Sequence, residues 1–445
     1  MPEIVALLQT IRPFISKTTL RQMSHVVYGL LVSTRRITMR ELSRWTESGG
    51  SYRTLQRWYH SGLPWLQVMW GFFRQQVWQA GHDYIAAGDE VVIGKAGHET
   101  YGLGRFFSSL QQRAIPGLAF FVFALIDVQA RQSYPLHVAQ IVKDASEPKP
   151  KGKVPKAKSE KRQVGRPKGS KNNAGNPPTL SPELVRIQPM LHAFLSLLGG
   201  GVRVSYLALD GHFGNYPSAW MVLHAGVHLI SKLRHDAALY EPFAGKYSGR
   251  GPHPKYGPKV DVRQMKKKYL HSDTVEEGIR TQIYQATLLN KEFAFPLNGV
   301  VILKTNLTTQ AQAHVILFTT DLKLVAPKVV AFYSLRFQIE FNFRDAKQYW
   351  GLDDFMNVTQ TAVTNAANLS FFMVNFSASL LKRFQRLNPE FSILDLKAHY
   401  RGCRYVAETL KFLPQKPDSI LLTDIFEQIA RLGMIHPAFD PAPTS

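Results

Sequence analysis

The spacing of hydrophobic residues changes after about residue 80. Residues 1 to about 80 carry apolar side chains at helical spacing, whereas residues 83–143 read as three strands. Within that segment, residues 117–129 are apolar on both faces, which is typical of a strand at the centre of a sheet. The pattern therefore predicts a helical region followed by three strands, with the apolar strand in the middle.

Helix and strand alternate again after residue 180. Ser181 and Pro182 are typical of a helix start, and three glycines at 199–201 are expected to end that helix. A strand then ends at Asp210, and further glycines follow it. The remaining predicted elements are strands at 202–209, 227–233, 300–306 and 313–321, a helix from about 217, and helical segments between 333 and about 434.

The most unusual pattern lies in residues 333–347. If these residues form one helix, five polar side chains fall in a stripe roughly 80° wide, and apolar residues border that stripe on both sides. A solvated helix face would instead lie opposite a single apolar face. One carboxylate among cations favours a metal-binding acid flanked by groups that hold a polyanion. The stripe consists of Tyr333, Arg336, Glu340, Arg344 and Lys347.

The amino-acid composition favours some classes of binding partner over others. The 445 residues carry a formal net charge of +22, and 45% of them are hydrophobic, which favours a folded protein that binds nucleic acid. The longest apolar run, residues 115–126, is too short to span a membrane and is better explained as a buried strand. The single cysteine excludes an internal disulfide and a cysteine-rich zinc site. With no signal-peptide pattern, we expect a cytoplasmic protein.

Two short helices are predicted over residues 38–45 and 51–60. Thr38 and Ser51 are suitable N-cap residues, and a glycine-containing break separates the two segments. Helix, turn and basic helix are similar to a helix-turn-helix that reads DNA. A small helical bundle with exposed basic residues would give the same pattern, so both interpretations stay open. The side chains that would face DNA are Arg53, Gln56 and Arg57.

Residues 145–178 differ in composition from the rest of the chain. They hold ten Lys or Arg residues against two Glu, and they have almost no apolar side chains. Such a segment cannot bury enough surface to fold, so we predict a disordered basic insert. Within it, Arg166 and Lys168 belong to a GRPKG run that resembles an AT-hook, whose arginine binds the minor groove of A·T-rich DNA. A plain basic linker that only attracts phosphates is the alternative.

Residues 234–298 interrupt the alternation of helix and strand, and we interpret them as a β insertion. Tyrosines and phenylalanines are interleaved here with lysines and arginines. Aromatic rings stack on bases while cations hold phosphates, so the composition suits single-stranded or distorted nucleic acid. An ordinary β insertion with tyrosines on one face is the alternative.

Three carboxylates occupy positions that suit chemistry. Asp89 precedes EVVI at the expected start of a strand, Asp210 ends a strand before glycines, and Glu340 lies on the striped helix. Taken alone, Asp89 is better explained as a turn or strand-end residue. Together, three acids from separate elements could bind two magnesium ions, which activate a water or 3′-hydroxyl and stabilise the leaving oxygen of a phosphodiester.

Four residues of the stripe match a Y-(2)-R-(3)-E-(6)-K pattern with every gap kept. This pattern resembles the signature of the IS-four group of bacterial DDE transposases, and the resemblance covers roughly residues 81–380. It implies an α/β fold with a ribonuclease-H-like, retroviral-integrase-like catalytic core that carries a β insertion. It also implies two divalent cations, magnesium or manganese, bound by Asp89, Asp210 and Glu340, and transposon-end phosphates held by Tyr333, Arg336 and Lys347. Arg344 is outside the signature, and we assign it to Glu340 or to DNA.

The reaction implied by this resemblance is cut-and-paste transposition, in which a freed 3′-hydroxyl makes a hairpin, the hairpin reopens, and the end joins target DNA. The implied partners are double-stranded DNA at transposon ends and target, and a second copy in a synaptic homodimer at the bacterial nucleoid. We expect a helical DNA-binding domain at 1–80, a catalytic domain at 81–380 and a C-terminal helical region at 381–445. A structure-specific nuclease, such as a junction resolvase, and a catalytically silent DNA-binding protein of transposon origin are the alternatives.

Overall fold

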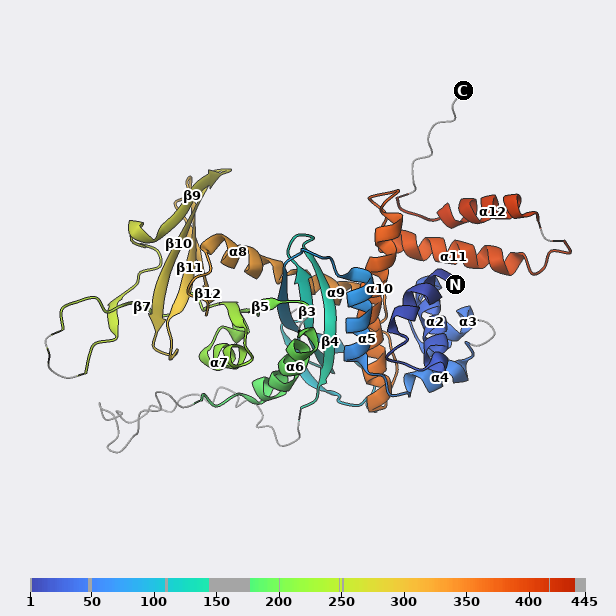
Figure 1. The fold of residues 1–445 in the computed structure, drawn as a ribbon, viewed down its shortest axis with the longest axis horizontal. Helices are drawn as coiled ribbons and strands as arrows, with labels where there is room; N and C mark the ends of the chain where they lie inside the picture. Colours follow the sequence, from blue (N-terminus) through green and yellow to red (C-terminus); the bar gives the residue numbers. More distant parts are fainter. Residues whose placement is uncertain are drawn as a thin grey trace, which may run out of the picture. The chain divides into compact units, whose positions relative to one another are not determined.

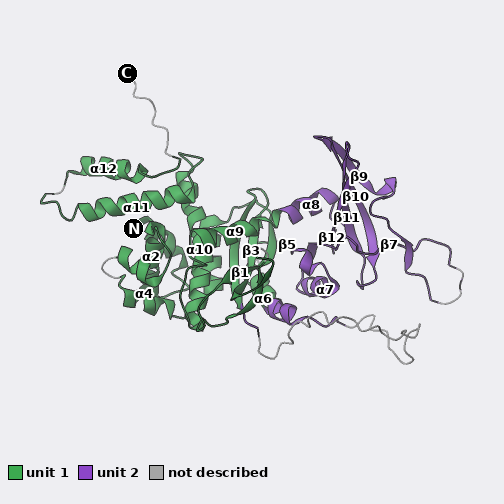
Figure 2. Cartoon of the chain, turned by 180° about the vertical axis from the view of Figure 1, so that it is seen from behind, with its two compact units in different colours: residues 1–140, 190–204, 335–445 green, residues 141–189, 205–334 purple. Residues whose placement is uncertain are grey.

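The computed structural model describes residues 2–46, 50–108, 111–143, 177–199, 201–247, 249, 252–415 and 417–436. The chain divides into two compact units, which Figure 2 shows in green and purple. The first unit comprises residues 1–140, 190–204 and 335–445, and the second comprises residues 141–189 and 205–334. The first unit is therefore built from stretches that are far apart in the sequence, whereas only residues 190–204 separate the two stretches of the second unit.

The first unit begins with helices that continue to residue 77, as the hydrophobic pattern predicts (Figure 1). Both predicted N-caps form. Thr38 Oγ1 accepts a hydrogen bond from the Glu41 amide at 3.2 Å, and Ser51 Oγ accepts one from the Thr54 amide at 3.4 Å. The elements are α1 (Pro2–Leu8), η1 (Gln9–Ile11), α2 (Lys17–Val32), α3 (Met39–Trp45), α4 (Tyr52–Tyr59), α5 (Trp65–Phe72) and η2 (Phe73–Val77).

The sheet of the first unit contains β1 (Tyr84–Gly94), β2 (Gly104–Ser108), β3 (Arg113–Asp127) and β4 (Gln132–Ile141). β3 pairs with each of the other three strands and is buried from Gly117 to Asp127. The prediction of a central apolar strand is therefore confirmed. A Cβ at Gly117 would lie 2.1 Å from the carbonyl oxygen of Ile93, so glycine is required where β1 and β3 approach. The pattern did not predict β2, because its five residues show no clear strand period.

A buried helix, α10 (Gln360–Phe384), holds the helical part of the first unit together, and nearly every residue from Ala362 to Leu380 is buried. Asn365 Oδ1 accepts a hydrogen bond from Trp65 Nε1 at 2.7 Å, and Asn365 Nδ2 donates to the carbonyls of Tyr59 and Ser61, both at 2.7 Å. The N-terminal helices are thereby fixed to α10. Among the described residues, no helix combines the length and apolar character that a membrane span requires.

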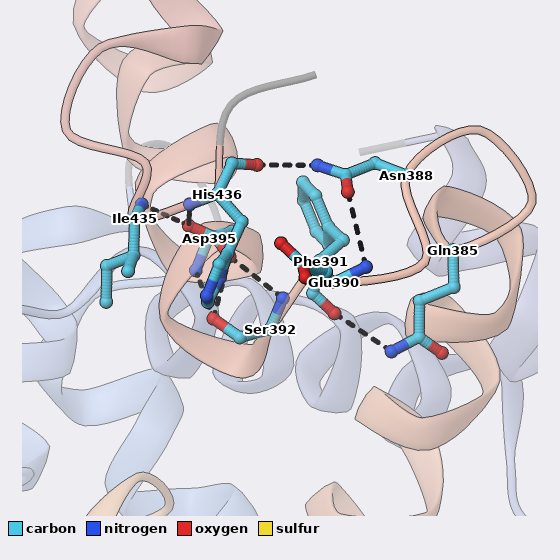
Figure 3. A network of polar contacts seen from close by, with 8 residues as sticks. All are labelled: Gln385, Asn388, Glu390, Phe391, Ser392, Asp395, Ile435 and His436. Carbon is cyan, nitrogen blue, oxygen red and sulfur yellow. Dashed lines mark hydrogen bonds and ion pairs between the residues drawn. The ribbon is translucent and has the colours of Figure 1, made fainter. Parts of the chain in front are cut away.

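The C-terminal helices α11 (Ile393–Thr409) and α12 (Ser419–Arg431) follow, and a polar network lies at the start of α11 (Figure 3). The buried carboxylate of Asp395 accepts hydrogen bonds from the amide of Ser392 at 2.9 Å, from its hydroxyl at 2.7 Å, and from the Ile435 amide. The imidazole Nδ1 of His436 lies 2.9 Å from the same carboxylate. Burial raises the pKa of Asp395, but the hydrogen bonds outweigh burial and hold that pKa at about 2.

The second unit contains the predicted alternation of strand and helix. Parallel strands β5 (Val204–Ala208) and β6 (His228–Lys232) are joined through η3 (Gly211–Phe213) and α7 (Tyr216–His224). From β6 the order continues β12, β11, β10, β7, β8, and β9 also pairs with β10. The other elements of this unit are β7 (Leu239–Pro242), β8 (Tyr256–Lys259), η4 (Lys267–Tyr269), β9 (Leu270–Glu276), β10 (Ile279–Asn290), β11 (Leu297–Asn306), β12 (Gln312–Thr319) and α8 (Ala326–Leu335). The boundary between the units falls inside α6 (Pro182–Leu198), after residue 189.

Residues 333–347 do not form one helix, so that prediction is wrong. Helix α8 ends at Leu335, a turn at Arg336 and Phe337 follows, and α9 (Gln338–Gln348) begins after it. In this turn the Ile339 amide donates to the Arg336 carbonyl at 3.1 Å, and the Glu340 amide donates to the Phe337 carbonyl at 3.0 Å. These bonds span three residues rather than four, which tightens the backbone and separates the two helices.

Asp89 also differs from its prediction. It lies in the middle of β1 rather than at the start of a strand. The small residues Ala86, Ala87 and Gly88 have low strand propensity, so they suggested a break. Their backbones nevertheless pair in register with β3, and all three are buried. Burial against the neighbouring strand outweighs local propensity here.

Candidate functional site

Asp89 is held by its own strand on one side. It lies opposite Val122 of β3, and its Oδ1 accepts a hydrogen bond from the Glu90 amide at 2.8 Å. The side chain is 21% exposed. The Oδ1 oxygen of Asp89 is therefore bound by the neighbouring residue, while Oδ2 contacts Arg336, which is far away in the sequence.

Helix α9 presents Glu340 in its first turn, where the helix dipole stabilises a carboxylate. Ile339, Asn342 and Ala346 form the buried face of the helix. On that face, Asn342 Nδ2 donates to Ser133 Oγ at 2.7 Å, which fixes the rotation of α9 against β4. Glu340 consequently lies toward solvent, with 42% of its side chain exposed.

Arg336 brings the two acids together. Its Nη1 lies 2.9 Å from Asp89 Oδ2, and its Nη2 lies 3.5 Å from Glu340 Oε1. Only 14% of the Arg336 side chain is exposed. One mostly buried guanidinium thus contacts a carboxylate from β1 and a carboxylate from α9, so both acids face the same position.

Lys347 attaches the other end of α9 to β1, because its Nζ donates to the Val92 carbonyl at 2.9 Å. Along a strand, Asp89 and Val92 are about 10 Å apart at about 3.3 Å per residue. Glu340 and Lys347 are also about 10 Å apart along a helix, at about 1.5 Å per residue. The E-(6)-K gap therefore matches three residues of strand, and α9 lies beside β1 with both ends attached. The predicted role of Lys347 at a DNA phosphate stays a prediction.

Lys95, just after β1, belongs to this region and was not predicted. Its Nζ donates to the carbonyls of Asp353 at 3.1 Å and Phe355 at 2.8 Å, and it lies 3.8 Å from the centre of the Phe355 ring. Burial lowers the pKa of Lys95 to about 8. The one sequence signal for it is its position six residues after Asp89, at the end of a strand.

Arg344 pairs with Asp345 instead of Glu340. Its Nη2 lies 2.9 Å from Asp345 Oδ1, and its guanidinium lies 4.9 Å from the centre of the Phe341 ring. One of the two roles predicted for Arg344 is thus replaced by a neighbouring pair, and its role at DNA stays a prediction. Phe337 and Phe341 form one of the two apolar borders of the predicted stripe, and they are 50% and 38% exposed. That border therefore does not pack into the core.

Asp210 belongs to the second unit, where it caps η3. Its Oδ1 accepts a hydrogen bond from the His212 amide at 3.1 Å, and its carbonyl accepts one from Ser231 Oγ at 2.7 Å. A Cβ at Gly214 would lie 2.1 Å from the Lys232 carbonyl oxygen, which explains the second glycine after the acid. The prediction of an acid after a strand and before glycines is confirmed, and its role as a metal ligand stays a prediction.

The residues predicted to read DNA on α4 are accessible. Arg53, Gln56 and Arg57 are exposed, while Leu55 and Trp58 form the buried face of the same helix. This amphipathic arrangement suits both interpretations of the N-terminal helices, a DNA-reading motif and a bundle with basic residues on its surface.

The other residues predicted to contact DNA differ in how accessible they are, and some lie outside the described residues. Tyr333 is partly buried in α8. Arg166 and Lys168 lie outside the described residues. In the β insertion, Tyr284 is only 7% exposed and packs in the core. The centre of the Tyr240 ring lies 4.8 Å from Lys291 Nζ, so a cation of this chain already contacts the ring.

The two acids of the first unit fit a divalent cation by their chemistry. Carboxylate oxygens are the ligands that magnesium and manganese prefer, and Asp89 and Glu340 face one position. Within the described part of the first unit, no group of three His, Cys, Asp or Glu side chains is placed to hold a metal ion. A magnesium site in proteins often has one or two carboxylates completed by substrate phosphates and water, which suits this pair.

Comparison with known families gives a match to this chain. The model of the DDE superfamily endonuclease matches residues 10–291, a segment that contains Asp89 and Asp210 and ends before Glu340. No curated protein matches the chain. Membership implies a ribonuclease-H-like core within this mixed α/β fold, nuclease activity on DNA, and the divalent metals that such nucleases generally use. This chain belongs to the DDE superfamily of endonucleases.

Proposed function

We propose that the chain is a cut-and-paste transposase of the IS-four group, which cleaves transposon ends and joins them to target DNA. The observation that carries the proposal is that three residues of the Y-R-E-K pattern converge on β1. Arg336 contacts Asp89, Glu340 shares that guanidinium, and Lys347 binds the backbone three residues further on. Residues that are defined by their spacing along one segment thus lie around Asp89, the first of the three proposed catalytic acids.

Asp89 and Glu340 are the proposed ligands for magnesium or manganese, with Asp210 as the third acid on the resemblance alone. When bound there, two cations would activate a water or 3′-hydroxyl and stabilise the leaving oxygen. The chain itself orients the DNA. Tyr333, Arg336 and Lys347 hold phosphates of the transposon-end strand, and the attachment of α9 to β1 keeps both acids in fixed positions.

Other parts of the chain provide DNA binding in this proposal. Arg53, Gln56 and Arg57 of α4 contact the transposon end, and Arg166 and Lys168 of the basic insert enter an A·T-rich minor groove. Excision passes through a hairpin, and a homodimer bridges the two ends. The large positive charge of the chain supports DNA as the partner.

Incubation with the DNA that flanks the chain's own gene, in magnesium, tests this proposal. We expect 3′-nicked, hairpin and joined products in succession, and we expect Asp210→Asn to abolish them while end binding persists. Nicking without strand transfer would instead favour a structure-specific nuclease. Binding without any magnesium-dependent nicking would favour a silent DNA-binding protein.

A further inference from the structure

Arg336 occupies the position between the two acids that a metal ion would take. Each of its terminal nitrogens contacts a different carboxylate, at 2.9 Å for Asp89 and 3.5 Å for Glu340. Two carboxylates that face one position repel each other unless a cation lies between them. The guanidinium supplies one positive charge against their two negative charges. The pair is thereby partly neutralised in the chain without any added ion.

A guanidinium and a divalent cation cannot both occupy this position. A magnesium ion binds carboxylate oxygens at about 2.1 Å, so it would sit on the same oxygens that Arg336 contacts. Two positive groups would then lie a few ångströms apart in a partly buried place, where their repulsion is large. Asp89 Oδ1 accepts a hydrogen bond from the Glu90 amide, and Oδ2 contacts Arg336, so a metal ion that binds Oδ2 competes directly with the guanidinium.

We propose that Arg336 is an internal counter-ion, which holds Asp89 and Glu340 together in the DNA-free protein and which a divalent cation must displace. The displaced guanidinium then becomes available for a DNA phosphate. The DNA-free protein therefore binds metal weakly, and metal and DNA support each other's binding. This inference rests on the proposed function, because it takes Asp89 and Glu340 as the metal ligands.

The test is the affinity of the DNA-free protein for manganese, measured from free Mn²⁺ by electron paramagnetic resonance. Arg336→Gln removes the competing charge, so we expect it to bind Mn²⁺ about tenfold more tightly than wild type. Arg280→Gln is the matched control, because it also removes one arginine that pairs with an aspartate, Asp273. Its affinity for Mn²⁺ should equal that of wild type.

Two further variants complete the test. Arg336→Lys keeps the positive charge, but its single ammonium cannot bridge two carboxylates as a guanidinium does, so its affinity should lie between wild type and Arg336→Gln. This variant decides the question if Arg336→Gln does not fold. Adding Asp89→Asn to Arg336→Gln should remove the gain in affinity. A gain that persists in the double variant would place the new metal elsewhere and overturn the inference.

Equal or weaker Mn²⁺ binding by folded Arg336→Gln and Arg336→Lys would also overturn it, because Arg336 would then organise the acids without competing. If wild type nevertheless nicks transposon-end DNA in magnesium, only this inference fails. If wild type does not nick DNA and neither Arg336 variant binds Mn²⁺, both the proposed function and this inference fail.

Discussion

The charged side chains around Asp89 and those of the β9–β10 hairpin are connected in opposite ways. Near Asp89, three cations each bind a partner about 250 positions away in the sequence: Arg336 to Asp89, Lys347 to Val92 and Lys95 to Phe355 lie 247, 255 and 260 positions apart. Arg336 also contacts Glu340, four positions away. In the hairpin, Arg280 pairs with Asp273 seven positions away. The exposed fraction of the arginine side chain is 14% for Arg336 and 46% for Arg280.

This difference indicates what each set of charges does. An exposed local pair gains little, because water screens it and two long side chains must be ordered. A partly buried cation that joins distant elements fixes their relative position, and removing it leaves buried partners unsatisfied. The charged residues near Asp89 therefore fix the relative position of β1 and α9, whereas those on the hairpin can contribute to solubility or attract DNA.

The largest expected difference is in nicking rate, between variants that lose a carboxylate near Asp89 and a variant that loses a carboxylate of the hairpin. Asp89→Asn and Glu340→Gln should each slow magnesium-dependent nicking by about a thousandfold or more, because metal ligation is worth several kcal/mol in the transition state. Asp273→Asn removes a carboxylate of the hairpin and should leave the rate within about twofold of wild type, a difference of less than about 0.5 kcal/mol. Initial rates on transposon-end DNA measure all three variants. Normal strand transfer by the Asp89 or Glu340 variant would remove that residue from the ligand set.

The next largest difference is expected in the free energy of unfolding, between partly buried and exposed lysines that bind backbone carbonyls. Lys95→Met and Lys347→Met should each lower the free energy of unfolding by about 1–3 kcal/mol, since a charged donor is lost from partly buried carbonyls. Lys255 also donates to a carbonyl, that of Ala294 at 3.3 Å, but this contact is exposed. Lys255→Met should therefore be close to wild type in urea denaturation. Equal losses in all three variants would contradict the contrast.

Acid should weaken the network at the start of α11 in a defined window. The folded pKa of Asp395 is about 2, below the value of about 4 for an unfolded chain, so its contribution is present above pH 4. That contribution, about 2 kcal/mol, is lost as pH falls from about 4 through 2. Asp395→Asn should thus be less stable at pH 7 and show a flatter pH dependence below 4. Parallel curves for variant and wild type would refute this account.

The smallest effect is expected for the hairpin pair itself. Arg280→Ala should leave the melting temperature at that of wild type within experimental error, because both partners are solvated and salt screens them. Differential scanning calorimetry at low and high salt checks this expectation. A clear loss at low salt would show that the hairpin depends on its charges as the Asp89 region does.

Patterns that act over a few residues were predictable. The caps at Thr38 and Ser51 and the apolar strand β3 follow from local hydrogen bonding and from periodicity. The break at Arg336 was not predictable, because bonds spanning three or four residues leave nearly the same sequence pattern. Lys95 was missed for another reason, since its carbonyl partners lie more than 250 positions away.

The sequence by itself determined the basic character of this chain, its N-terminal helices, its central apolar strand, and the spacing of Arg336, Glu340 and Lys347. The candidate chemistry follows from that spacing and from the three acids, whereas family membership is shown by the match over residues 10–291. Only the tertiary structure decided that Asp89 and Glu340 share one guanidinium and that Lys347 reaches the backbone of β1. The reason is physical: spacing along one segment places side chains on a face, but packing of β1 against α9 decides which groups that face meets.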